Sequence, residues 1–193
     1  MKKIWVKALL VIATLLFLAT PCMAKEKVIK WKVQGFVPAG MLYHDTLVRL
    51  AAAVEKTTNG RLVFEVHPAG SLVPPFEGIK AVSDGVYQAN YGYTGQWVGK
   101  IPVAPLFCSI PGGFNPLDMQ MWLNEGGGKE LWQEMYDTYG YKVKVFVSDP
   151  IAMEDFMWAK KPLKTIDDFK GIKMRMMPLM GDVLAKHGMS VIF

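Results

Sequence analysis

The sequence has 193 residues, of which 51% are hydrophobic and 20% charged, with 22 Lys and Arg against 17 Asp and Glu. This composition excludes a disordered tail and a small disulfide-stapled fold. Without residues 1–24 the chain has 19 basic and 17 acidic residues, and no run of Lys and Arg that could neutralise a line of phosphates. We therefore expect no nucleic acid partner.

Residues 1–24 have the pattern of a secretory signal peptide. Basic residues precede an apolar run from Ala8 to Thr20, and the small-residue end Cys22-Met23-Ala24 suits a signal peptidase. The apolar run is shorter than the ~20 residues that a membrane-spanning helix needs. We expect a cleaved signal, with a non-cleaved anchor as the alternative.

Short strands alternate with helices in residues 28–91. The pattern predicts strands at 28–36, 62–66 and 86–91, a helix with Leu47, Leu50, Ala51 and Val54 on one face that stops at Asn59-Gly60, and a helix at 74–83 presenting Phe76, Ile79 and Val82. This order predicts an α/β fold with parallel pairing and right-handed crossovers. Because ligands of such sheets bind at the carboxyl ends of the strands, the loops after Phe36, Val66 and Tyr91 are where we expect a site.

The second half continues the alternation. Asn115-Pro116 is a cap followed by proline at the first helical position. The pattern predicts one helix from Pro116 to about Asn124 and another around Leu131, Trp132, Met135 and Tyr136. Strands are predicted at 142–147 and 151–159, followed by a one-turn helix capped by Thr165. A strand at 172–176, a helix at 178–187 and a strand at 190–193 complete the chain. No helix follows the last strand, so we expect the chain to be the front part of a longer protein.

Motifs for metal binding and catalysis are missing from the sequence. The three histidines have no second His, Cys or carboxylate at a metal-ligand spacing, and we find no nucleophile elbow, Walker loop or Cys/His pair. For His44-Asp45, at a predicted helix start, helix capping is preferred over a functional role.

Arg175 and a run of aromatic residues are the candidates for ligand binding. Arg175 lies in a strand between apolar neighbours, where a guanidinium needs an acceptor, and a carboxylate fits its planar fork. That carboxylate belongs either to the protein, as a structural ion pair, or to a ligand. The residues at the third strand's end suit either a core or a cavity wall: Tyr87, Tyr91, Tyr93 and Trp97, with Gln88, Asn90 and Gln96.

Two stretches resemble a known family, the periplasmic solute-binding subunits of TRAP transporters, or DctP-like class. One runs from Pro162 to Arg175, with Asp167-Asp168-Phe169-Lys170-Gly171 at its centre. The other comprises 114–116 through 126–132, preceded by 91–97, and resembles the subgroup that binds 2-oxo acids and other small monocarboxylates. The resemblance covers the whole chain after the signal.

The resemblance implies roles for particular residues. Arg175 stands where the family's arginine pairs with the ligand carboxylate, which favours the ligand over a structural pair. Where the subgroup has a glutamine that helps hold a ligand-bridging cation, this chain has Glu154, which would strengthen Na⁺ or Ca²⁺ binding or, without a metal, repel an anionic ligand. The alternative for Glu154 is a surface carboxylate on an edge strand. Phe36, Tyr91, Tyr93, Gln96 and Trp97 would supply the rest of the ligand site.

The resemblance also implies a mechanism of binding without turnover. Two α/β lobes would close on a 2-oxo acid, hydroxy acid or dicarboxylate in the periplasm and present it to the membrane permease. The first lobe comprises residues 25–150, and residues 151–193 form the start of the second. A homodimer of the full-length protein is a further expectation. The rival hypotheses are an exported enzyme on a two-lobed scaffold and a binding protein of another transporter or a sensor.

Overall fold

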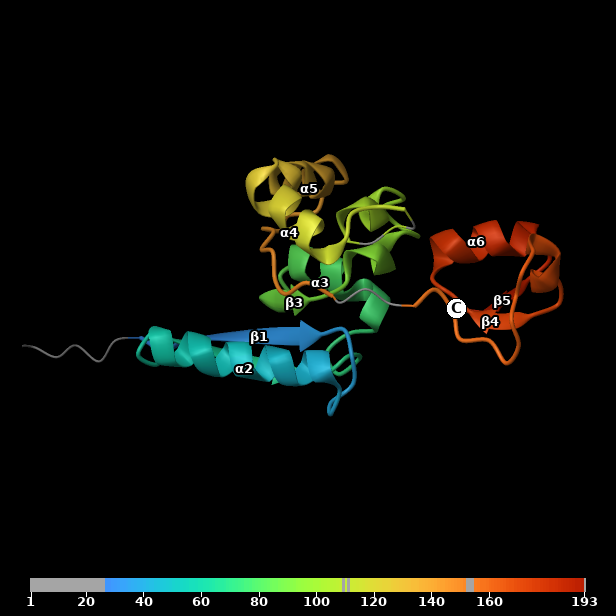
Figure 1. Ribbon diagram of the computed structural model, residues 1–193. Helices are drawn as coiled ribbons and strands as arrows, with labels where there is room; N and C mark the ends of the chain where they lie inside the picture. Colours follow the sequence, from blue (N-terminus) through green and yellow to red (C-terminus); the bar gives the residue numbers. More distant parts are fainter. Residues whose placement is uncertain (1–26, 109, 111, 152–154, 193) are drawn as a thin grey trace, which may run out of the picture.

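The computed structural model describes residues 27–108, 110, 112–151 and 155–192, and its first sheet contains three parallel strands (Figure 1). The central strand β1, Ile29–Gly35, pairs with β2, Leu62–His67, on one side and with β3, Ala89–Tyr91, on the other. Gln34 is level with His67, and Gly35 is level with Tyr91. The predicted parallel pairing is confirmed. β3 is shorter than the predicted strand at 86–91, since its pairing with β1 begins at Ala89.

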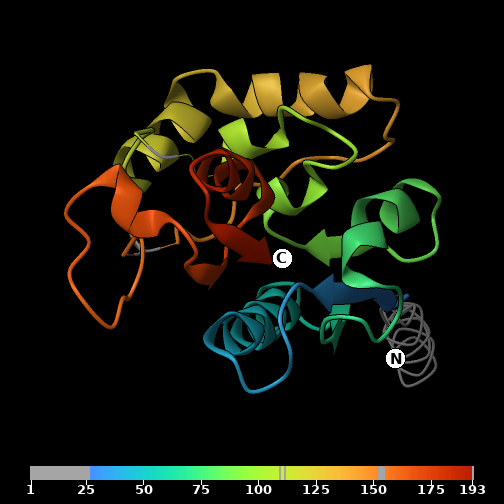
Figure 2. The same ribbon diagram turned by 90° about the vertical axis from the view of Figure 1, so that its right-hand side faces the viewer.

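Helices cover both sides of this sheet. The helix α2, Leu42–Thr57, packs on β2 and β1, and α3, Gly78–Ser83, follows the 3₁₀ turn η1, Pro75–Glu77. Figure 2 shows α2 and α3 on opposite sides of the strands. The predicted faces are partly wrong: Leu47 and Ile79 are buried, whereas Leu50 is 43% and Phe76 62% exposed. Phe76 faces outward because it lies in the 3₁₀ turn and not in the α-helix.

A second layer of packing joins the irregular segment after β3 to two helices. The 3₁₀ turns η2, Thr94–Trp97, and η3, Ala104–Phe107, lead to α4, Pro116–Glu125, and α5, Gly128–Thr138. The predicted cap is confirmed, since the Asn115 side chain accepts a hydrogen bond from the backbone N–H of Asp118 at 3.0 Å. These elements share one core, which comprises Ile79, Trp97, Ile101, Ala104, Phe107, Met119, Leu123, Met135, Tyr136 and Val145.

The predicted strand at 142–147 is wrong, although Val143, Val145 and Val147 do alternate with exposed residues. Val145 is buried and Val143 and Val147 pack against the core, but no ladder forms. Side chains take the place of a strand partner: Ser83 Oγ accepts from the N–H of Lys142 at 2.9 Å, and Gln133 binds the backbone of Val143 and Val145 at 2.8 and 3.0 Å. The alternating pattern of this segment therefore matches the side chains that are buried. Formation of a strand would also require a neighbouring strand, and none pairs with this segment in the described structure.

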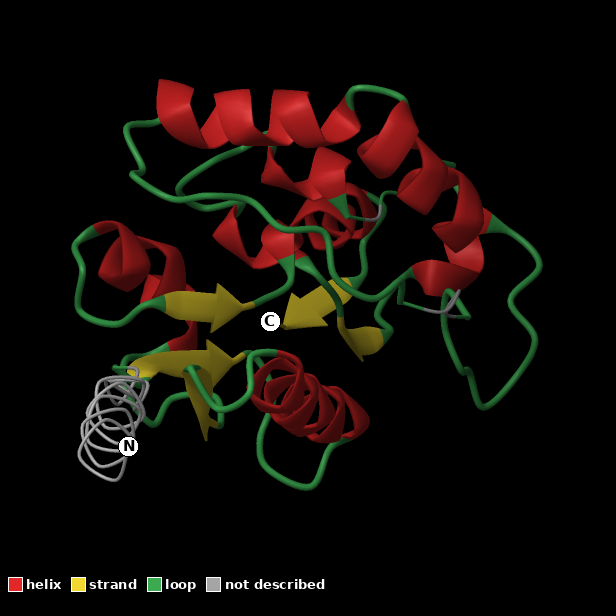
Figure 3. Cartoon of the chain, turned by 90° about the vertical axis from the view of Figure 1, so that its left-hand side faces the viewer, coloured by secondary structure: helices red, strands yellow, loops and turns green. Residues whose placement is uncertain are grey.

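The C-terminal part has a small sheet of its own. The strands β4, Lys173–Arg175, and β5, Ser190–Ile192, pair in parallel, and α6, Pro178–Lys186, connects them. The turn η4, Ile166–Phe169, begins after its predicted cap Thr165. Figure 3 shows this two-stranded sheet apart from the three-stranded one, and in Figure 1 the arrowhead of β1 points toward the part that holds β4, β5 and α6.

Two predictions concern residues that the structure does not describe or describes in part. The predicted signal at 1–24 lies outside the described residues. The predicted strand at 151–159 is wrong for 151 and 155–159, which form no strand, because no neighbouring strand pairs with them. The division at residue 150 into two lobes stays a prediction. Within the described ranges, no helix has the length and apolar character needed to cross a membrane.

Candidate functional site

Aromatic side chains meet at the carboxyl edge of the first sheet. β1 and β3 end at the same level, so the residue after β1, Phe36, comes beside Tyr91. The ring centroids of Phe36 and Tyr91 lie 5.6 Å apart, and Tyr43, from the first turn of α2, lies 5.4 Å from Phe36. The parallel register thus brings together two of the predicted site residues and adds Tyr43, which the sequence reasoning missed.

A carboxylate completes this carboxyl-edge cluster, which we define as Phe36, Tyr43, Tyr91 and Asp149. The Tyr91 hydroxyl donates a hydrogen bond to Asp149 Oδ2 at 2.7 Å, and the neighbouring Ser148 hydroxyl donates to Oδ1 at 2.5 Å. The Gln120 amide of α4 holds the Ser148 carbonyl at 3.2 Å. Residues 148–149, which follow the Val143–Val147 segment, are therefore tied to the sheet edge and to α4.

The hydrogen bonds also set the protonation of the pair. Burial raises the pKa of Tyr91, and its bond to Asp149 raises it further, because the carboxylate stabilises the protonated phenol. Partial burial would raise the pKa of Asp149, but the hydroxyls of Ser148 and Tyr91 outweigh that effect and hold it below its usual value. At neutral pH the cluster therefore carries one negative charge, on Asp149.

Gln34 fixes the loop that borders the cluster. Its side chain is 1% exposed, donates to the Val73 carbonyl at 3.0 Å, and accepts from the backbone N–H groups of Leu72 and Val73 at 2.8 and 3.1 Å. The Val37 carbonyl also accepts from the N–H of Ala69 at 3.0 Å. The loops after β1 and β2 are thereby joined, which gives the edge a fixed backbone.

The other predicted aromatic and amide residues lie in different surroundings. Trp97 is 3% exposed and belongs to the shared core. Tyr93 and Gln96 are half-buried, and Gln96 Nε2 is buried without a hydrogen bond to any described residue. The structure thus separates Trp97 from the carboxyl-edge cluster, and the ligand contacts of these three residues stay predictions.

Two histidines near this edge also have buried ring nitrogens. His44 is in the first turn of α2 and His67 ends β2. Neither His44 Nδ1 nor His67 Nε2 has a hydrogen-bond partner among the described residues. Across the same ranges no group of three His, Cys, Asp or Glu side chains is arranged to hold a metal ion.

Arg175 ends β4, level with Ile192 of β5. Its side chain is exposed while Met174 is half-buried, so the guanidinium does not lie buried among its apolar neighbours. The strand has one covered face, and Arg175 lies on the other. No described residue forms an ion pair or hydrogen bond with the guanidinium. Glu154, the other predicted charged site residue, lies outside the described residues.

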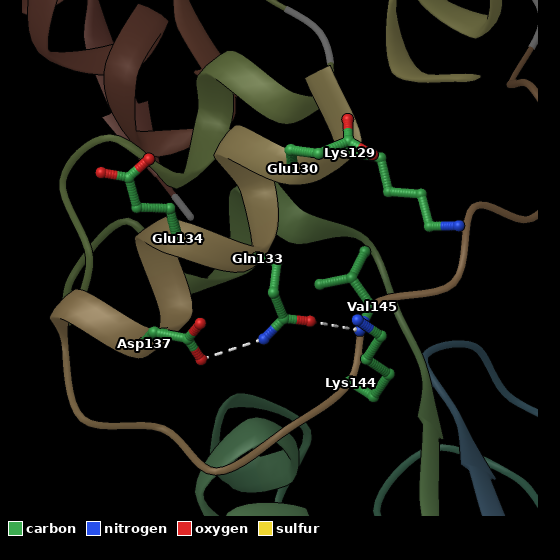
Figure 4. A pocket seen from close by; sticks show the side chains of 7 residues that line it. All are labelled: Lys129, Glu130, Gln133, Glu134, Asp137, Lys144 and Val145. Carbon is green, nitrogen blue, oxygen red and sulfur yellow. Dashed lines mark hydrogen bonds between the residues drawn. The ribbon is translucent and has the colours of Figure 1, made fainter. Parts of the chain in front are cut away.

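A charged hollow lies elsewhere, beside α5 (Figure 4). It measures about 280 Å³ and is lined by Lys129, Glu130, Gln133, Glu134, Asp137, Lys144 and Val145. Gln133 crosses it and binds both Asp137, at 3.0 Å, and the Val143–Val145 backbone, so its amide serves the packing of that segment. None of the predicted ligand-binding residues lines this hollow.

The chain belongs to the bacterial extracellular solute-binding proteins of family 7, the DctP family of TRAP solute-binding proteins, whose model matches residues 34–192. This confirms the resemblance found in the sequence, and with it a family of binding proteins and not of enzymes. The sheet topology agrees with the α/β periplasmic-binding-protein-like fold.

A monocarboxylate 2-oxoacid-binding periplasmic protein of Nostoc sp. is 29% identical over 84% of this chain and 44% of its own length. A TRAP solute-binding protein of Colwellia psychrerythraea with bound calcium and pyruvate has a TM-score of 0.72 at 25% identity, over 86% of this chain and 51% of that one. One from Pseudoalteromonas atlantica with bound sodium and pyruvate has a TM-score of 0.70 at 26% identity, over 86% and 50%. The chain therefore spans about half the length of these relatives.

Proposed function

We propose that this protein is the extracytoplasmic solute-binding subunit of a TRAP-type transporter and captures a small organic acid, with 2-oxo acids favoured over hydroxy acids and dicarboxylates. The observation that carries the proposal is the family match over residues 34–192 together with an ordered aromatic cluster at the carboxyl edge of its parallel sheet. Binding of 2-oxo acids by the relatives supports the preference.

Arg175 would bind the ligand carboxylate. Its guanidinium is exposed at the end of β4, has no partner among the described side chains, and presents donors that match a carboxylate in a bidentate pair. Phe36, Tyr91, Tyr93 and Gln96 would shape the opposite wall, and Trp97, buried in the shared core, would support that wall from behind. Closure of the two lobes would then exclude water and strengthen the ion pair.

A cation would bridge the ligand to the protein. The two relatives with pyruvate also contain calcium or sodium, and Glu154 supplies the type of oxygen ligand that these ions prefer. A bound cation would neutralise the Glu154 carboxylate, which otherwise opposes an anionic ligand. We infer no other cofactor.

The location and partners follow from the same proposal. The signal at 1–24 would direct the protein to the periplasm and be cleaved there, and the TRAP membrane permease would receive the loaded, closed form. A homodimer of the full-length protein stays a prediction. The rival roles as an exported enzyme or as the receptor of another system are disfavoured by membership in the DctP family.

The test is calorimetric titration of the full-length protein with pyruvate and with succinate. Arg175→Ala should weaken pyruvate binding by roughly 2 to 5 kcal/mol, because truncating one partner of a closed-site charge pair leaves the other unpaired. Lys173→Ala is the matched control, since Lys173 is an exposed cation on the same strand. Equal affinities for wild type and Arg175→Ala would contradict the role of Arg175, and no heat with any acid would contradict the proposed function.

The cation is tested by chelation. We expect chelator-treated protein to bind pyruvate more weakly and to recover when Ca²⁺ or Na⁺ is restored. Glu154→Gln should reduce this dependence on the cation. If chelation changes nothing while Glu154→Gln improves binding, Glu154 acts on the ligand or on Arg175 directly and no metal bridge exists.

A further inference from the structure

The charges around the carboxyl edge of the first sheet are unevenly distributed. The three loops that form this edge are residues 36–45, 67–75 and 91–97, and they contain no Lys or Arg. Their only acidic residue is Asp45, an exposed side chain in the first turn of α2. Their only titratable bases are His44 and His67, whose buried ring nitrogens have no partner among the described residues.

Asp149 adds a fixed negative charge to this edge. Its two oxygens accept from the hydroxyls of Tyr91 and Ser148, and no described cation forms an ion pair with it. The hydrogen bonds orient the carboxylate and favour its ionised form. They leave the negative charge in place, because both donors are neutral.

We propose that Asp149 is a specificity-determining residue that rejects ligands carrying a second carboxylate. The inference rests on the proposed function, in which Arg175 binds the first carboxylate from the other part of the chain. The remote end of the ligand would then face the carboxyl-edge cluster, where aromatic faces accept an uncharged tail. A second carboxylate would meet Asp149 without a Lys or Arg from the three loops to compensate it.

The physical cause is repulsion between like charges. Asp149 is exposed at this edge, and closure of the two lobes over a ligand would remove water from around it and strengthen the repulsion. Two like charges brought together there oppose binding by at least the equivalent of about a tenfold change in affinity. An uncharged tail of the same length avoids that repulsion and gains apolar contact with Phe36 and Tyr91. Selectivity of this kind depends on an unfavourable contact with the wrong ligand.

A matched pair of ligands isolates the effect. 2-Oxovalerate and 2-oxoglutarate have the same 2-oxo acid head and the same number of carbons, and differ in a terminal methyl against a terminal carboxylate. We would titrate both into the full-length protein with its cation present, using wild type, Asp149→Asn and Asp45→Asn. Asparagine keeps an oxygen that can accept from Tyr91, and Asp45→Asn removes an exposed charge from the same edge as the control.

Wild type should prefer 2-oxovalerate by at least about tenfold. Asp149→Asn should lower this ratio about tenfold, mainly by tighter binding of 2-oxoglutarate, while Asp45→Asn leaves the ratio within about twofold. Asp149→Ser, which also keeps an oxygen acceptor, should shift the ratio in the same direction. If both Asp149 variants bind the two acids with the wild-type ratio, or lose both affinities in parallel, Asp149 has only a structural role and the inference fails. If wild type binds neither acid, the proposed function fails first.

Discussion

Replacing Gln34 by leucine should destabilise the protein strongly although the two side chains are similar in volume. Gln34 is 1% exposed, and its amide is the partner of three backbone groups in the loop after β2: the N–H of Leu72 and both the N–H and the carbonyl of Val73. Leucine would fill the space but satisfy none of them. A buried backbone group that loses its partner costs about 1 to 3 kcal/mol.

The expected loss follows from these three bonds. The loop is only partly buried, so water can replace some of the lost bonds, and we expect the free energy of unfolding to fall by about 3 kcal/mol. Urea denaturation followed by tryptophan fluorescence would measure it, with the slope checked for two-state behaviour. Gln88→Leu is the control, because the Gln88 side chain is exposed and accepts a single bond from the N–H of Lys32 at 2.9 Å.

The control should lose less than about 1 kcal/mol. A loss in Gln34→Leu no larger than in Gln88→Leu would refute the reasoning, since burial of the three backbone groups would then carry no cost. Pyruvate affinity should also fall in Gln34→Leu, because the loop it holds borders the carboxyl-edge cluster.

Three further outcomes test the packing around the site. Burial raises the pKa of Tyr87 to about 12, so the unfolded chain ionises first and stability should fall between pH 10 and pH 12, by up to about 1.4 kcal/mol per pH unit. In urea melts across this range Tyr87→Phe should lose less stability than wild type, and parallel curves would contradict this. Asn115→Ala should cost about 1 kcal/mol in a thermal melt through loss of the α4 cap, and an unchanged melting temperature would disprove that role. Gly78→Ala should lower the free energy of unfolding by roughly 1 to 3 kcal/mol, because its new Cβ would lie 2.9 Å from Asn90 Cγ. Gly99→Ala is the control, since a Cβ there would have nothing within 4 Å. Similar losses of stability in both variants would count against the clash.

Helix caps and the helix and strand patterns of most elements could be predicted from the sequence, because these signals act within a few residues. Asn115 caps a helix through a backbone group three positions away, and in β1 Trp31 and Val33 are more buried than Lys32 between them, as the two faces of a strand require. The helices between short strands predict the parallel order, which places Phe36 and Tyr91 at one edge of the sheet. Arg175 was found by its charge in an apolar segment, although its outward direction was not.

Tertiary structure alone decided what depends on residues distant in the sequence. The segment 142–147 has the alternation of a strand, yet Ser83 and Gln133 bind its backbone in place of a neighbouring strand. Asp149 follows that segment, and no local pattern relates it to Tyr91, 58 positions earlier. Their hydrogen bond exists because β3 and the chain after α5 pass the same edge of the sheet, which is a property of the packed fold. Phe36 and Tyr91 could therefore be predicted from sequence, whereas Tyr43 and the charge on Asp149 could not.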